Sequence, residues 1–94
     1  MNFDAFMQTL KQSAPPADFS VYLQSLWYDG KGNWHKAHTL IQEVEDKTGS
    51  WIHAYLHRKE GDNRNANYWY GQAGKPMPHY TLKQEWEEIV KALL

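Results

Sequence analysis

The sequence predicts an all-α fold: a compact bundle of about six short helices in one domain that covers residues 1–94. Apolar residues recur at steps of three and four along most of the chain, as they do in a helix that buries one face. Glycine, proline and helix-capping residues separate these segments, and no segment alternates as a β-strand does. The segments within residues 51–74 predict a repeat-like antiparallel helix pair in the centre of the bundle.

The first two helices are delimited by prolines and glycines. The first is expected over about residues 3–12, before the prolines at 15 and 16, whose rings cannot donate a backbone hydrogen bond. The second follows a cap supplied by Asp18 or Ser20. It ends in the turn 29–32, where two glycines permit the left-handed backbone that helix ends often need.

Two central helices are expected next. Asn33 is a good cap for the third helix, which we expect Gly49 to close. Ser50 then caps the fourth helix, over about residues 51–60. The dipole at the start of that helix would disfavour a charged His53.

The last two helices carry clear start signals. Gly61 ends the fourth helix, and Asp62 caps a fifth helix that Gly74 ends. Thr81, with Gln84 three residues later, is a capping-box signature for a sixth helix.

Composition excludes several classes of function. The formal charge is −1 and there is no long basic run, which argues against binding of duplex nucleic acid. There is no cysteine, so neither a disulfide framework nor a thiolate metal site can form. No stretch approaches the ~20 apolar residues that span a bilayer. We therefore expect a soluble cytoplasmic protein without nucleic-acid or membrane partners.

A dense pattern of aromatic, histidine and small residues occupies the middle of the chain: Trp34-x-x-Ala37-His38-x-x-x-Gln42, then Trp51-Ile-His-Ala-Tyr-Leu-His-Arg58, Glu60-Gly-Asp62, Asn65-Ala66 and Tyr68-Trp-Tyr-x-x-Ala-Gly74. Over residues 23–78 this pattern resembles an uncharacterised family of small proteins, and the resemblance implies no activity. Residues 61–73 are also similar to the second half of a Sel1-like or tetratricopeptide repeat. A solenoid needs at least three repeats, so that similarity implies only a repeat-like helix pair.

Three histidines are candidate metal ligands. His53 and His57 are four residues apart, which places both imidazoles on one side of the fourth helix. His38 on the preceding helix can supply a third nitrogen, and Glu60 can supply an oxygen. Three protein ligands plus water make a catalytic type of zinc site, although the His-Glu-x-x-His signature is absent. The alternative is that these histidines are hydrogen-bonded groups at the rim of the core.

Polar residues around the turn at Gly61 have two interpretations. Arg58 can bind a carboxylate or phosphate in two-pronged fashion, or it can pair with a nearby acid. Asp62 can orient an imidazole, but a helix cap is the favoured interpretation.

Some of the aromatic residues are expected in the core and one is expected at a groove. Trp34, Trp69 and Trp86 are assigned to the core. Tyr68 points away from it and is expected to line a groove with Trp51 or Tyr55.

We expect the chain to be a binding module for a small polar or anionic ligand or a protein partner, because pockets combine apolar walls with a few placed polar groups. The candidate ligand-binding residues are His38, Gln42, His53, His57, Arg58, Glu60 and Tyr68. One alternative is a small enzyme, either with a divalent metal or with a histidine base oriented by Glu60 or Asp62. Another is a homo-oligomer whose self-association completes a small core. No other cofactor is evident.

Overall fold

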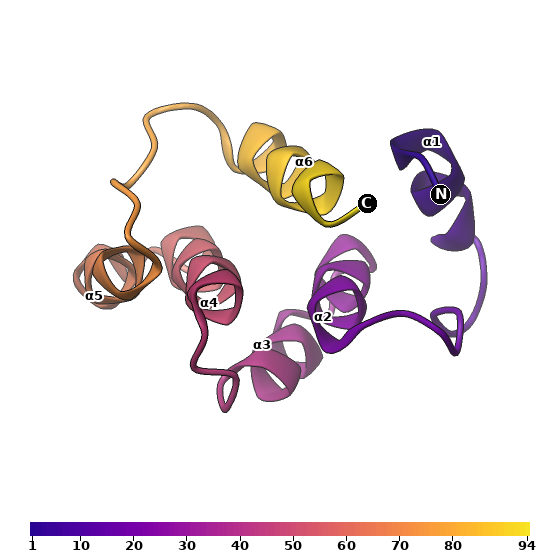
Figure 1. Ribbon diagram of the computed structural model, residues 1–94, viewed down its shortest axis with the longest axis horizontal. Coiled ribbons are helices and arrows are strands. Elements are labelled where there is room, and N and C mark those ends of the chain that lie inside the picture. Colours follow the sequence, from indigo (N-terminus) through magenta and orange to yellow (C-terminus); the bar gives the residue numbers. More distant parts are fainter.

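The computed structural model describes all residues, 1–94, and contains six α-helices and no strand, which confirms the predicted all-α bundle (Figure 1). The helices are α1 (Phe3–Thr9), α2 (Val21–Gly30), α3 (Trp34–Ile41), α4 (Lys47–Lys59), α5 (Asn63–Ala73) and α6 (Leu82–Leu93). Figure 1 shows α4 in the middle, with α5 on one side, α2 and α3 on the other, and α6 above. The pair α4 and α5 makes the most extensive contact, as expected for the central repeat-like pair.

Every helix begins at a polar side chain that accepts a backbone N–H from the first turn, which satisfies one of the donors that a helix start leaves open. These caps are Asn2, Ser20, Asn33, Asp46, Asp62 and Thr81. Ser20, not Asp18, caps α2. The capping box of Thr81 and Gln84 is present as predicted.

The predicted boundary between the third and fourth helices is wrong. Helix α3 ends at Ile41, and α4 begins at Lys47 after the cap Asp46, four residues before the expected start. Gly49 lies inside the first turn of α4, where an added Cβ would come within 2.2 Å of the Val44 carbonyl oxygen. The glycine therefore serves a close approach between chain segments and does not end a helix.

Two consequences follow for the neighbouring residues. Ser50 is buried within α4 and caps nothing. His53 lies in the middle of α4, so the expected effect of a helix start on its charge does not apply.

Helix α1 is also shorter than expected, because it ends at Thr9. Beyond it, backbone N–H groups of residues 10–12 bond carbonyls only three residues back, which tightens the chain out of the α-helix. The Lys31 ammonium then binds the carbonyl oxygens of Leu10 and Gln12 at 2.7 and 3.1 Å.

The core is rich in aromatic residues. Trp27, Trp51, Tyr55, Tyr70 and Trp86 are buried within one cluster of apolar side chains. No helix has the length and apolar character that crossing a bilayer requires.

Two of the tryptophans assigned to the core from the sequence are only half-buried. Trp34 and Trp69 pack against the edge of the apolar cluster. Both rings stack on histidines instead of entering the centre, and this stacking places them at the candidate site.

Candidate functional site

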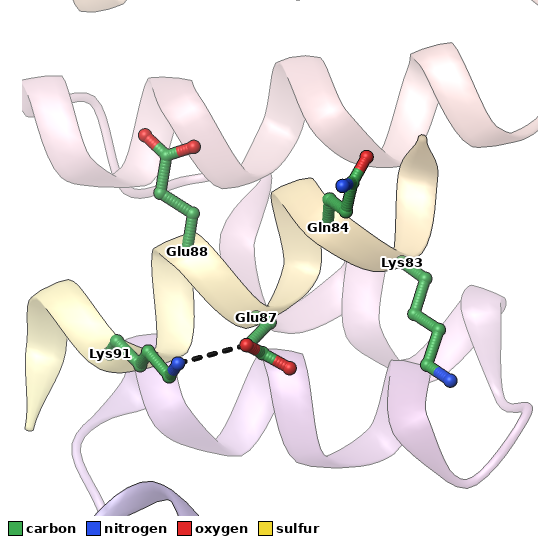
Figure 2. A pocket seen from close by; sticks show the side chains of 5 residues that line it. All are labelled: Lys83, Gln84, Glu87, Glu88 and Lys91. Atoms are coloured by element: carbon green, nitrogen blue, oxygen red, sulfur yellow. Dashed lines mark hydrogen bonds and ion pairs between the residues drawn. The ribbon is translucent and has the colours of Figure 1, made fainter. Parts of the chain in front are cut away.

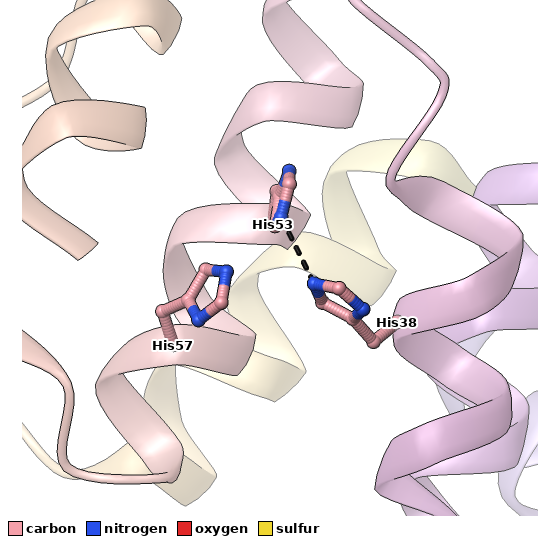
Figure 3. A group of neighbouring side chains, drawn as sticks. All are labelled: His38, His53 and His57. Carbon is pink, nitrogen blue, oxygen red and sulfur yellow. Dashed lines mark hydrogen bonds between the residues drawn. The ribbon is translucent and has the colours of Figure 1, made fainter. Parts of the chain in front are cut away.

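The three candidate histidines come together where α3 packs against α4 (Figure 3). His53 and His57 lie one turn apart on α4, and His38 reaches them from α3. The Nε2 atoms of His38 and His53 are 3.1 Å apart. One ring nitrogen from each of the three lies within 4.8 Å of the others, so the predicted convergence is present.

Two tryptophans flank this histidine cluster. The Trp34 ring stacks on His38 with centroids 4.9 Å apart and planes 9° apart. The Trp69 ring stacks on His53 at 4.1 Å and 22°. Trp34 is fixed in turn, because its Nε1 donates to the Leu56 carbonyl oxygen at 2.8 Å. The cluster is thus held between α3, α4 and α5 by flat apolar surfaces.

Glu60 orients the third imidazole. The Nδ1–H of His57 donates to Glu60 Oε1 at 2.6 Å, which leaves Nε2 on the side of the other two histidines. Glu60 is itself exposed, at the C-terminal cap of α4. Asp62 lies close to the same pair, but its carboxylate accepts the backbone N–H of Asn65 at 3.2 Å. The helix-cap interpretation of Asp62 is therefore confirmed.

Burial keeps two of the imidazoles neutral. Desolvation, followed by the proximity of His57 and His38, lowers the pKa of His53 to about 4. The pKa of His38 is lowered for the same first reason and by His57, while Glu60 acts in the opposite direction. A neutral imidazole has a nitrogen lone pair available, which is the form that accepts a proton or binds a metal.

Arg58 points away from the histidine cluster. Its guanidinium bonds Glu85 Oε1 at 2.9 Å and the Tyr80 carbonyl oxygen. Of the two interpretations of Arg58, pairing with an acid is the one observed.

Gln42 and Tyr68 also lie outside the cluster. Gln42 is the exposed C-cap of α3. Tyr68 is 58% exposed and packs edge-on against Trp69. It borders a shallow depression with three polar residues of the α5 start and does not share a groove with Trp51 or Tyr55. Of the seven candidate ligand-binding residues, four meet: the three histidines and Glu60.

Sequence reasoning missed a buried carboxylate. The Glu85 side chain is fully buried, and it accepts hydrogen bonds from the Trp51 indole at 3.1 Å and the Tyr70 hydroxyl at 2.7 Å. The sequence does indicate this burial: position 85 is three residues after Leu82 and four before Ile89, so it lies on the apolar side of α6.

Asp29 is a second missed carboxylate. It is also buried, and it accepts the Tyr55 hydroxyl at 2.6 Å and the Lys59 ammonium at 2.9 Å. Burial and the adjacent carboxylates raise the pKa of both tyrosines, Tyr55 and Tyr70, so the phenols stay protonated donors.

No cavity is lined by a histidine of the cluster. The outer side of α6 carries a depression of about 380 Å³ lined only by polar side chains (Figure 2). It contains an exposed ion pair between Lys91 Nζ and Glu87 Oε2, which are 2.9 Å apart and one helical turn from each other. Such pairs contribute little free energy, and nothing apolar shapes a ligand site there.

Comparison with known proteins does not extend this description: no family model, curated protein or solved structure matches the chain. The family resemblance seen in the sequence stays a prediction.

Proposed function

We propose that this protein is a small helical module that binds one divalent transition-metal ion through Nε2 of His38, His53 and His57. The supporting observation is the convergence of their ring nitrogens within 4.8 Å. Two imidazoles that each lie about 2.0–2.1 Å from one zinc ion at a tetrahedral angle have nitrogens about 3.3–3.4 Å apart. The 3.1 Å between His38 and His53 needs a shift of only a few tenths of an ångström to reach that arrangement.

The surroundings of the cluster support the same assignment. A histidine that binds a metal usually donates its other N–H to a carboxylate or carbonyl, which fixes the ring and makes the ligand more basic. Glu60 accepts this bond from His57. The lowered pKa values of His38 and His53 favour the deprotonated form that coordinates an ion.

The three imidazole ligands limit which metal ions the site can bind. Imidazole suits zinc, copper, nickel, cobalt and iron, whereas magnesium and calcium take oxygen ligands. Three imidazoles without a fourth protein ligand leave a coordination position for water or a small anion. We therefore expect a zinc-like ion with an exchangeable fourth ligand.

Metal analysis of protein purified without a histidine tag, followed by zinc titration in competition with a chromophoric chelator, tests the proposal. We expect one zinc per chain. We also expect His38→Gln to weaken zinc binding by at least about ten-fold, because even loss of a supporting partner has an effect of that size. His35→Gln is the matched control, since His35 is exposed on the same helix. Substoichiometric metal together with equal zinc affinity of the wild type and His38→Gln would refute the assignment.

Acid–base catalysis is a second candidate, favoured by the 2.6 Å contact between His57 and Glu60. In this version the carboxylate orients the imidazole, and His57 Nε2 accepts a proton from a substrate. The absence of a cavity at the cluster is why we place metal binding first. Single His→Ala variants that lose a discovered activity without loss of helicity, in metal-free protein, would favour the enzyme.

We also propose a cytoplasmic location, with self-association as an alternative role. Light scattering across a dilution series measures the second, and a cooperatively folded monomer at micromolar concentration would exclude it.

A further inference from the structure

A second cavity, of about 360 Å³, lies where α1, α2, α4 and α6 meet, and no histidine lines it. Its volume is near the lower end of the range for small-molecule sites, which is about 300–1,000 Å³. Most of the lining is apolar: Met7, Leu10, Leu82 and Trp86 supply the walls. Met7 is 38% exposed although it is a large apolar side chain, so the mouth of the cavity presents unburied apolar surface.

The floor of this groove depends on a glycine. An added Cβ at Gly30 would lie 2.9 Å from Cζ2 of Trp86 and 3.3 Å from a methyl group of Leu10. Trp86 is anchored at this depth, because its Nε1 donates to the Leu26 carbonyl oxygen at 3.0 Å. The absence of a side chain at position 30 therefore lets the indole form a flat apolar surface beneath the groove.

The two lysines that line the groove differ in whether they form an ion pair. Lys59, one of the two lining lysines, pairs with the buried Asp29 at 2.9 Å, and Asp29 also accepts the hydroxyl of the lining residue Tyr55. Lys83, the other lysine of the lining, forms no ion pair with any carboxylate of the chain. Figure 2 shows its side chain extending away from the Glu87–Lys91 pair. Of the two lysines that line the apolar groove, Lys83 is therefore the one whose ammonium group has no carboxylate partner.

We propose that this groove binds a small amphipathic carboxylate, with an alkyl or aryl tail against Trp86 and Leu10 and the carboxylate at the Lys83 ammonium. A volume of about 360 Å³ is near the lower end of the range for small-molecule sites and therefore limits the ligand to a short tail. A chain of about eight carbons with one carboxylate is within that limit. This site is separate from the histidine cluster, so the two proposals succeed or fail independently.

Octanoate is the probe, and proton–nitrogen correlation spectra of the labelled full chain are the measurement. We expect saturable shifts of the Trp86 indole N–H and the Gly30 amide. Octanol and octylamine have the same tail with no charge and with the opposite charge, so both should bind more weakly than octanoate. Shifts that are equal for the three compounds, or that are absent at millimolar octanoate, would overturn the proposal.

Two lysine variants on the same helix locate the charge. Lys83→Gln should weaken octanoate binding about two- to five-fold, the size expected for one exposed ion pair, and should leave octanol binding unchanged. Lys91→Gln is the control, because Lys91 lies outside the groove and pairs with Glu87. Both lysines are exposed, so neither variant threatens the fold. Equal octanoate affinity of Lys83→Gln and the wild type would also overturn the proposal.

Discussion

Acidification of the metal-free protein should lower its stability well before the carboxylates titrate. The pKa of His53 is lowered from 6.5 to about 4 in the folded chain. Between these values the unfolded chain binds more protons than the native chain. The stability contributed by neutral His53 is therefore complete above about pH 6.5 and is lost as pH falls toward 4. His38 adds to the loss, because its pKa is also lowered.

The magnitude follows from the shift. One pKa unit corresponds to about 1.4 kcal/mol, so the full shift of His53 corresponds to about 3 kcal/mol. About 2 kcal/mol of this is lost by pH 5, where most carboxylates are still ionised because their ordinary pKa values are about 3.9–4.3. Such a loss is a large fraction of the stability of a small domain.

Urea unfolding from about pH 8 to about pH 5, with a chelator present, measures this loss. His53→Gln should show a shallower dependence on pH, because the replacement does not titrate. His79→Gln, which removes an exposed histidine, should behave as the wild type. If the wild-type midpoint falls no more than that of His53→Gln, the histidines do not form an uncompensated neutral cluster.

Three further outcomes concern the packing of the bundle, and chemical denaturation measures each. Glu85→Ala should lower the free energy of unfolding by about 3–5 kcal/mol, because it leaves the Arg58 guanidinium without its buried partner. Gly49→Ala should lower the free energy of unfolding by about 1–3 kcal/mol, because the added Cβ clashes with Val44. Gly71→Ala, whose Cβ meets no other atom, should raise it by about 0.5–1 kcal/mol. Equal effects of the two variants would contradict the close approach of Gly49 to Val44. Trp51→Ala should lower the free energy of unfolding by about 3–5 kcal/mol, because it removes a large buried ring, whereas His57→Gln exchanges buried side chains of similar size and should lower it less; equal losses would contradict this.

Helix starts were predictable where the deciding contact is local. Asn33, Asp62 and Thr81 cap their helices through backbone groups three residues away, so a short stretch of sequence contains the whole interaction. The start of α4 was not predictable in this way. Both Asp46 and Ser50 can cap a helix; in the structure the Asp46 carboxylate accepts the Gly49 N–H, and Gly49 lies too close to Val44 for any side chain.

The candidate site was predictable for a related reason. The spacing of His53 and His57 fixes their common side of α4, and a short connection brings the His38 helix alongside. The stacking of Trp34 and Trp69 was not predictable, because amphipathic spacing does not distinguish the centre of a core from its edge. The role of Arg58 could not be decided from the sequence, because its partner Glu85 lies 27 residues away on α6.

Helix α4 has the histidine cluster on one side and two ion pairs with buried carboxylates on the other. On one side, His53 stacks on Trp69 and His57 donates to the exposed Glu60, and burial lowers the pKa of His53. On the other side, Arg58 and Lys59 neutralise carboxylates buried on α6 and α2. Because the pKa values of His38 and His53 are lowered in the folded chain, protonation of these two imidazoles below about pH 6.5 favours unfolding. Mild acid should therefore act on the contact between α3 and α4, where His38 meets His53, and the ion pairs of Arg58 with Glu85 and of Lys59 with Asp29 lie on the other side of α4.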